Sequence, residues 1–341
     1  KSGPRPEAVT DDAERPGGYN GTTLVGAAGD SYTPTASVTL TAQWEGEPLP
    51  DYASVNYERA VGYGKLINEL YWNSATKLSK LTPSGGTPYL WPFTEQVSMV
   101  NGILLTMDKE DEDYAFYTQY LEELIEGLRH YRVSSVNPQA WENEEHYLAK
   151  FGETDGTANA YAIYNSGRND SAIDSVNTSA GGVFFDDNVW VAKELYYAYV
   201  NTGKAEYFNE AVNILNWIVG EGYESTEGLN GIYWNWAAKF MFEGSTSLND
   251  NTHASLNACS SAPTAMMLAK VYQTMTEDAQ FTEKFAALAP DYLSKAQNIY
   301  EFCYSVLRNP TNGCLRDKVF LREGFEEMSD LSQQIQLYDE Q

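Results

Sequence analysis

Two adjacent aspartates, Asp186 and Asp187, are the residues whose types and spacing best suit catalysis. Two glycines and a short apolar run precede them, and residues at helical spacing follow: Val189, Ala192, Tyr196 and Tyr199. The pattern predicts that both carboxyl groups lie at the start of a helix that ends near Gly203. Neighbouring side chains at a helix start diverge by only about 100°, whereas in a strand they point to opposite faces. Both carboxyl groups are therefore expected to reach one substrate.

A structural role and a metal site are the two alternatives for this pair. Aspartates in a first helical turn satisfy free amides and complement the helix dipole, which needs no substrate. The aromatic side chains Phe184, Phe185 and Trp190 instead favour a pocket, because aromatic surface around acids is typical of sites that hold sugar rings. The spacing disfavours a metal or diphosphate site, since no His or Glu follows at ligand spacing. We therefore expect no metal and no cofactor.

The stretch FFDDNVWVAKELYYAYVNTGKAEY, residues 184–207, resembles the signature of glycoside hydrolase family 76, the bacterial and fungal endo-α-1,6-mannanases. Further motifs follow in the order expected for that family, and the matches span most of residues 52–317: Gly231-Ile232-Tyr233-Trp234, then Asn257-Ala258-Cys259-Ser260-Ser261-Ala262-Pro263, Cys303-Tyr304-Ser305 and Asn312-Gly313. The resemblance implies an (α/α)6 barrel and hydrolysis of α-mannan or manno-oligosaccharides. It also implies that Asp186 is the nucleophile and Asp187 the acid/base.

The spacing of the two acids favours a retaining mechanism. Retaining glycosidases hold their carboxyl groups about 5 to 5.5 Å apart and inverting ones about 6.5 to 9.5 Å, and side chains from adjacent Cα atoms more naturally reach the shorter range. Repulsion between two close carboxyl groups separates their pKa values, so one stays ionised and the other protonated. Candidate sugar contacts stand at matching motif positions, although each also suits a structural role: Trp91, Asn188, Trp190, Trp234 and Asn257.

Composition narrows the class of protein. The 341 residues carry a formal charge of −26, so a phosphate backbone is repelled and nucleic acid is excluded as a partner. No apolar run approaches the roughly 18 residues that span a bilayer. Three cysteines are too few for a disulfide framework, and we expect buried thiols, with a Cys303–Cys314 pair as the alternative. We expect a monomer.

Three segments are predicted along the chain. Residues 1–18 form a linker, and residues 19–47 form a partial β repeat with a strand at 37–44. This second segment resembles the tail of a β-grasp repeat of the internalin B-repeat kind, found in bacterial cell-surface proteins. Residues 48–341 form the catalytic domain. The repeat, the acidity and a large polysaccharide substrate together predict an extracellular or cell-surface location.

Helical periodicity dominates after Asp51 and predicts an all-α fold. Helices are expected at 53–72, 92–107 and 262–276, the last with Pro263 in its first turn. Three further helices follow from apolar residues at helical spacing: Tyr117, Leu121, Leu124 and Leu128; Phe208, Ala211, Leu215 and Ile218; Tyr292, Ala296, Ile299, Cys303 and Val306. In the order of the family's motifs, a helix that ends in Tyr272 follows residues 257–263. His130, His146 and His253 are isolated, and we assign them no role.

The sequence supplies seven or eight helices where the resemblance implies twelve, so we expect a domain incomplete at its C-terminus, with any export signal outside this sequence. Apolar residues near 53–107 and 290–308 should then be exposed, and the tail 319–341 should be loosely packed. Two other functions stay open. One is a different glycan-active (α/α)6 enzyme, such as an unsaturated uronyl hydrolase or a sugar epimerase. The other is a non-catalytic glycan-binding module, which does not need two adjacent carboxyl groups.

Overall fold

The computed structural model describes residues 18–20, 23–26, 41–42, 52–134, 157–163, 182–236, 239 and 253–337. The chain divides into two compact units, Lys1–Glu58 and Arg59–Gln341. In the first unit, β1 (Gly18–Asn20), β2 (Thr23–Gly26) and β3 (Thr41–Ala42) form an antiparallel sheet of order β2-β1-β3. Strand β3 covers two residues of the strand expected at 37–44, whose other residues lie outside the described part. The β-grasp resemblance stays a prediction.

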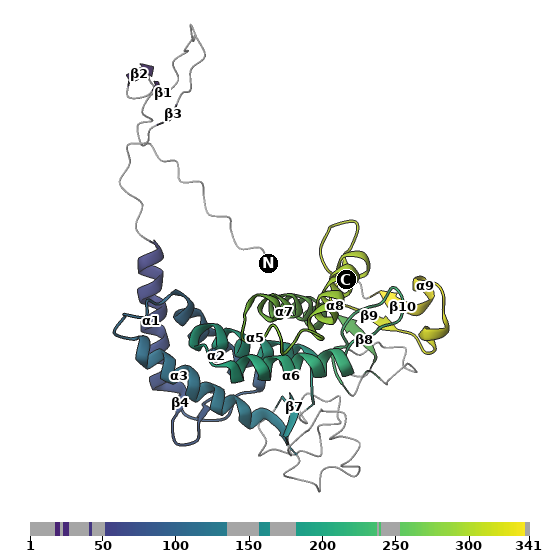
Figure 1. Ribbon diagram of the computed structural model, residues 1–341, viewed down its shortest axis with the longest axis horizontal. Coiled ribbons are helices and arrows are strands. Elements are labelled where there is room, and N and C mark those ends of the chain that lie inside the picture. Colours follow the sequence, from purple (N-terminus) through teal and green to yellow (C-terminus); the bar gives the residue numbers. More distant parts are fainter. Residues whose placement is uncertain are drawn as a thin grey trace. The chain divides into compact units, whose positions relative to one another are not determined.

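Helices make up most of the second unit, as expected (Figure 1). Helix α1 (Tyr52–Tyr71) crosses the boundary between the units. It is followed by α2 (Leu90–Thr106), α3 (Tyr114–Leu128), α5 (Phe185–Thr202), α6 (Ala205–Glu221), α7 (Ala258–Glu277) and α8 (Ala289–Phe302). The apolar residues that predicted α3 and α6 are buried, so those helices bury the faces that the periodicity assigned to them.

The helices form two rows. Helix α5 packs between α2 and α7, and each of these three also packs against the helix that follows it in the chain: α3 on α2, α6 on α5 and α8 on α7. Helical hairpins placed side by side bury one face of each inner helix between its neighbours. The first helix of each hairpin therefore lies in the row that contains Asp186 and Asp187.

The C-terminal segment is packed, which corrects the prediction of a loose tail. Strand β9 (Lys318–Leu321) lies between β8 (Ser255–Asn257) and β10 (Ile335–Leu337) in an antiparallel sheet, with Leu256 opposite Val319. Val319 and Phe320 are buried. A central strand is bonded on both edges, and its burial is set by strands distant in the sequence. Shorter elements complete the unit: β4 (Trp72–Asn73), β5 (Leu78–Ser79), β6 (Arg132–Ser134), β7 (Thr157–Tyr161) and α9 (Leu331–Gln334).

Helix α7 begins earlier than predicted. Asn257 is its N-cap residue, and the Ala258 N–H donates to the Asp317 carbonyl at 2.7 Å, so β8 leads directly into the helix. Pro263 consequently lies inside the helix rather than in its first turn. Proline has no N–H, and it therefore removes the bond to the carbonyl of Cys259 four residues earlier. The prediction placed the start too late because it used Pro263 as the start signal.

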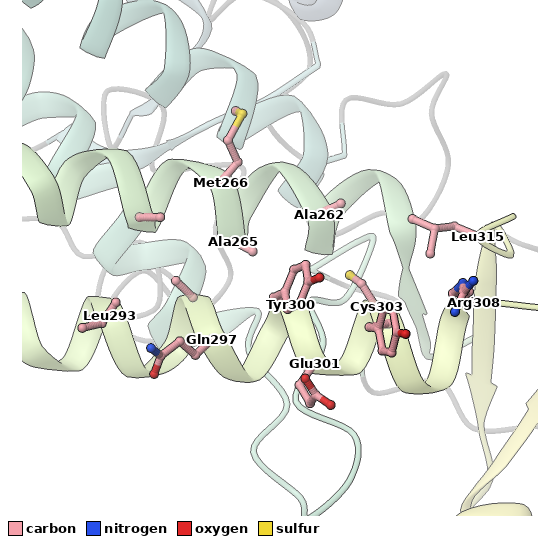
Figure 2. A pocket seen from close by; sticks show the side chains of 13 residues that line it. Ala262, Ala265, Met266, Leu293, Gln297, Tyr300, Glu301, Cys303, Arg308 and Leu315 are labelled. Atoms are coloured by element: carbon pink, nitrogen blue, oxygen red, sulfur yellow. The ribbon is translucent and has the colours of Figure 1, made fainter. Parts of the chain in front are cut away.

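Apolar side chains are exposed along α1 and near the end of α8, as expected for these segments: Tyr63, Leu66 and Leu70 on α1, Tyr300 on α8, and Tyr304 in the short helix Cys303–Leu307 that follows α8. Tyr300 and Tyr304 border a groove of about 630 Å³ between α7 and α8 (Figure 2). Alanines of both helices line the groove, and Arg308 lies at one end. No residue of β8, β9 or β10 lines this groove.

Candidate active site

Backbone hydrogen bonds join the N-terminal ends of α2, α5 and α7. The Leu90 N–H donates to the Ile163 carbonyl at 2.9 Å, and the Ile163 N–H donates to the Gly182 carbonyl at 3.1 Å, which links α2 to the approach of α5. The Phe185 N–H donates to the Trp234 carbonyl at 2.9 Å. The Trp234 N–H donates at 3.3 Å to the carbonyl of Ser255, the first residue of β8, which leads into α7. The starts of the three inner helices thus meet at one end of the layer.

Asp186 and Asp187 lie in the first turn of α5, so the prediction of their position is confirmed. Phe184 is extended and precedes the helix, and Gly203 ends it with a φ of 70°. A left-handed residue at this position stops a helix, and glycine adopts that conformation without a steric penalty. The same local signals that fix the ends of α5 therefore place both carboxyl groups at its start.

The Asp186 carboxylate accepts hydrogen bonds from two donors. Its Oδ1 accepts from the Asp187 N–H at 2.9 Å, and its Oδ2 accepts from the Trp234 Nε1–H at 3.0 Å. The nearby Cys259 thiol also acts to lower the pKa of Asp186. Burial raises the pKa of Asp186, and these donors oppose the increase because they stabilise the charged form. The surroundings of Asp186 are thus built to hold a negative charge.

The Asp187 carboxyl group differs from its neighbour. Burial, followed by the negative charge of Asp186, raises the pKa of Asp187 well above its ordinary value. Among the residues that the structure describes, no side chain or amide donates a hydrogen bond to this carboxyl group. Asp187 therefore holds its proton more tightly than Asp186 does. Two neighbouring acids with separated pKa values can act as acid and base on one substrate.

Asn188 is not available to a sugar, which corrects its prediction as a substrate contact. The side chain is fully buried. Its Oδ1 accepts from the Tyr161 N–H at 2.7 Å, and its Nδ2 donates to the carbonyls of Tyr161 at 2.9 Å and Phe184 at 2.7 Å. Asn188 therefore attaches β7 to the first turn of α5. A structural role explains the asparagine that follows the two aspartates in the motif, because its hydrogen bonds hold the turn that carries both acids.

The other predicted asparagine, Asn257, is also buried. Its Oδ1 accepts from the Ser255 hydroxyl at 2.8 Å, and its N–H donates to the Ile232 carbonyl at 3.1 Å. These contacts match the structural interpretation, in which Asn257 hydrogen-bonds a buried loop. Asn257 is also the N-cap residue of α7, the helix that carries Cys259.

The three tryptophans predicted to contact substrate have different surroundings. Trp234 packs against Phe184, with ring centroids 5.0 Å apart, and bonds Asp186. Trp190 lies one turn after the acids on α5 and is half-buried, with the Lys193 ammonium 4.9 Å from its ring centroid. Trp91 is 58% exposed in the first turn of α2. Trp190 and Trp234 thus border the aspartates, while Trp91 is a free aromatic face at the start of a neighbouring helix.

The sequence analysis missed two residues beside the pair. Cys259 was expected to be buried like the other cysteines, yet Cys259 and Cys314 are exposed and only Cys303 is buried. All three are free thiols, so the alternative Cys303–Cys314 disulfide is absent. The ammonium group of Lys318, a buried residue, lies 5.6 Å from the ring centroid of Trp234 and 3.0 Å from Asp317. Cys259 lies in the family motif at residues 257–263, whereas no sequence signal marked Lys318.

An ion network around the buried Glu210 supports this end of the fold. Glu210 of α6 accepts hydrogen bonds from Arg129 at 2.8 Å, from Arg132 and from the Tyr161 hydroxyl at 2.7 Å. Burial would raise the pKa of Glu210, but the bonds and charges of the two arginines outweigh it, and the pKa lies below its ordinary value. The network holds Tyr161, whose backbone binds Asn188. It therefore supports the first turn of α5 from a distance.

No group of three or more His, Cys, Asp or Glu side chains within the described ranges is arranged to hold a metal ion. No described helix combines the length and apolar character that a membrane crossing requires.

Comparison with known proteins identifies structural relatives. A scan with protein-family models and a search of curated proteins both find no match. Among solved structures, a family 76 glycoside hydrolase, a mannosidase from Bacteroides thetaiotaomicron VPI-5482, matches with a TM-score of 0.52 and 19% identity, over 79% of this chain and 58% of that chain. A family 76 glycoside hydrolase from a bovine strain of the same species matches with a TM-score of 0.52 and 17% identity, over 84% of this chain and 49% of that chain.

A third structure widens the comparison to another activity. A D-mannose isomerase matches with a TM-score of 0.50 and 12% identity, over 80% of this chain and 60% of that chain. This chain spans about half to three-fifths of the length of the three structures. At these identities the similarity concerns the fold alone. The protein has a mainly helical fold that matches the (α/α)6-type structures of family 76 mannosidases and of a mannose isomerase.

Proposed function

We propose that the protein is a retaining endo-α-1,6-mannanase that hydrolyses the α-1,6-mannan backbone through Asp186 and Asp187. The observation that carries the proposal is the asymmetry of the pair: the Asp186 carboxylate accepts two hydrogen bonds, whereas the pKa of Asp187 is raised well above its ordinary value. A retaining glycosidase needs one ionised and one protonated carboxyl group on the two sides of one glycosidic bond. The fold shared with family 76 hydrolases supports the same conclusion.

In the proposed reaction the Asp186 carboxylate attacks the anomeric carbon, and the Asp187 proton passes to the glycosidic oxygen as the bond to the leaving sugar breaks. The products of this step are a glycosyl ester on Asp186 and a free sugar hydroxyl. Asp187, now ionised, removes a proton from water, which attacks the same carbon and releases Asp186. Two displacements at one carbon leave the configuration unchanged.

The aromatic residues around the pair supply the sugar-binding surface in this proposal. Trp234 hydrogen-bonds Asp186 and packs on Phe184, so a sugar ring bound beside the two aspartates would meet an indole that is already held in place. Trp190 offers a half-buried ring on the same helical face, one turn further along α5. The exposed ring of Trp91 is the proposed contact for a more distant sugar of a polymeric substrate.

The deciding experiment follows the anomeric proton signals during hydrolysis of linear α-1,6-mannan by NMR. The wild type should release α-configured product first, and Asp186→Asn and Asp187→Asn should each lower the rate more than about 1000-fold. Asp291→Asn is the matched control, because Asp291 lies in the first turn of α8 and is exposed at the surface. Full activity of Asp186→Asn, or a β-configured first product, would exclude the proposed nucleophile.

A sugar isomerase is the second candidate, since a mannose isomerase has a similar fold. The same preparations should therefore be incubated with D-mannose and analysed for D-fructose by chromatography. Conversion of mannose without hydrolysis of mannan would assign the isomerase activity instead. Binding of mannan without either reaction would identify a glycan-binding module.

We also propose that the protein works outside the cytoplasm, attached to the cell envelope. The support is chemical: a polymeric mannan is too large to enter a cell, and the chain carries a formal charge of −26. Fractionation of the native host with an antibody against this chain should find the protein in the envelope or medium. Recovery from the cytosol alone would reject this location.

A further inference from the structure

A cavity lined by arginines, which we call the arginine cavity, lies beyond the C-terminal end of α8. It has a volume of about 540 Å³ and is bordered by the short helix Cys303–Leu307, the turn that follows this helix, and the segment from α9 to β10 (Figure 1). Arg308, Arg316 and Arg322 line it. Three of the nine arginines of a chain with a formal charge of −26 therefore gather at one cavity.

Hydrogen bonds of the backbone hold these arginines in place. Arg308 lies opposite Leu315 in an antiparallel bridge, and Arg316 donates from Nη1 to the Arg308 carbonyl at 3.3 Å. Arg322 directly follows β9, and its N–H donates to the Gln334 carbonyl at 3.0 Å. The arginines thus stand on two hydrogen-bonded pairs of chain segments, so their positions are fixed before any ligand binds.

The charge at the arginine cavity is positive. Among the described residues, no Asp or Glu lines the cavity, and none forms an ion pair with Arg308 or Arg322. Glu323, which follows Arg322, is exposed and lies outside the lining, and Asp330 accepts from the Ser332 N–H at 2.9 Å as the cap of α9. Guanidinium groups that share a cavity without carboxylates repel each other, and an anion that enters removes this repulsion. The cavity is therefore suited to an anion.

The guanidinium groups favour a phosphate group as this anion. Arginine presents N–H donors in a planar fork that matches two oxygens of a phosphate. The Arg308 guanidinium carbon lies 5.1 Å from the Tyr304 ring centroid, over the ring. This contact holds the guanidinium by its face and leaves the N–H groups at its edge for a ligand. A phosphate monoester carries nearly two negative charges at neutral pH, which suits a site with more than one guanidinium.

The arginine cavity also has room for the molecule that carries the phosphate. A volume of about 540 Å³ lies in the range of small-molecule sites. Hydroxyl and amide groups are supplied by Ser305, Ser332 and Gln336, and apolar walls by Val306 and Ile335. A sugar carries both hydroxyl groups and apolar C–H faces, so it matches both kinds of wall. No described aromatic side chain lines the cavity, which disfavours the base of a nucleotide.

The cavity is close in the chain to the end of the helix layer that carries the two aspartates. Arg316 precedes Asp317, and the Asp317 carbonyl accepts from the N–H of Ala258, the first residue of α7, at 2.7 Å. We propose that the arginine cavity binds the phosphate group of a phosphorylated sugar, with Arg308 and Arg322 as its charged contacts. The site is separate from the aspartate pair, and binding there does not require hydrolysis of mannan.

The test is isothermal titration calorimetry of the whole chain with mannose 6-phosphate, glucose 6-phosphate, D-mannose and inorganic phosphate at equal ionic strength. Glucose 6-phosphate is included because the choice of mannose rests on the proposed function. At least one sugar phosphate should bind about tenfold more tightly than inorganic phosphate, and D-mannose should not bind at this cavity. Arg308→Gln and Arg322→Gln should each raise the Kd of that sugar phosphate about tenfold or more.

Two further variants sharpen the measurement. Arg59→Gln is the matched control, because it removes the same charge from the exposed surface of α1, and it should leave the Kd unchanged. Arg322→Lys keeps the charge without the planar fork, so its Kd should lie between those of the wild type and Arg322→Gln. Circular dichroism of each variant checks that it is folded.

Four results would overturn the proposal. The first is a wild type that binds no sugar phosphate, and the second is a Kd that neither Arg308→Gln nor Arg322→Gln changes. The third is equal affinity for inorganic phosphate, which would indicate an adventitious ion only. The fourth is sedimentation of the chain with vesicles that contain phosphatidic acid, without affinity for either sugar phosphate, which would assign the arginines to a lipid headgroup. Absence of mannan hydrolysis would reject the proposed function and leave these binding results to decide the site.

Discussion

Replacing Asn188 by alanine should destabilise the protein by about 3 kcal/mol. The fully buried amide makes three hydrogen bonds, to the N–H and carbonyl of Tyr161 and to the carbonyl of Phe184, at 2.7 to 2.9 Å. Each such bond contributes about 1 kcal/mol net. In Asn188→Ala the backbone groups of Tyr161 and Phe184 stay in the core without this hydrogen-bond partner and without water to replace it. For a urea m-value near 3 kcal/mol per M, the unfolding midpoint should fall by about 1 M.

The control for this measurement is Asn298→Ala. Asn298 is exposed and makes one long bond of 3.5 Å to Tyr223, so its loss should change stability by less than about 0.5 kcal/mol. The assay is urea unfolding followed by circular dichroism, with KM for mannan measured on the folded variants. A wild-type midpoint for Asn188→Ala together with a raised KM would refute the reasoning. It would show that the side chain contacts the sugar, as the sequence analysis had expected.

Three further predictions concern stability. The raised pKa of Asp187 means that the folded chain binds this proton more tightly than the unfolded chain does. The stability of the protein therefore falls as pH rises above the unfolded-state pKa of about 3.9. Asp187→Asn should raise Tm at pH 7, and this gain should vanish near pH 4. The lowered pKa of Glu210 has the opposite effect, because its ionised form stabilises the folded state. Glu210→Gln should lower the free energy of unfolding by about 3 kcal/mol at pH 7 in urea unfolding, and this loss should shrink as pH falls through about 4. Gly127→Ala should prevent stable folding in expression and circular dichroism tests, because its Cβ would lie 1.9 Å from the Lys77 carbonyl, whereas Gly102→Ala, with no neighbour within 4 Å, should fold normally. A Tm loss in Asp187→Asn at pH 7, an unchanged Glu210→Gln or a stable Gly127→Ala would each contradict its prediction.

The sequence by itself determined the helices and the location of the two acids. Apolar residues at helical spacing place the buried faces of α3 and α6, and Phe184 and Gly203 mark the ends of α5, because these signals act between residues within a few positions of each other. The pair at the helix start follows from the same local pattern. The predicted start of α7 was wrong. Pro263 was used as the start signal, although the helix begins at Ala258, directly after strand β8.

Only the tertiary structure decided what surrounds the pair. Asn188 turned out to bind the backbone of β7, and the Trp234 indole reached Asp186 from another part of the chain. The strand at Val319 became the centre of a sheet rather than a loose tail. Each of these contacts joins residues that are far apart in the sequence, and their pairing depends on how whole elements pack. A periodic pattern records which face of a helix is buried, but it does not record which distant residue lies against that face.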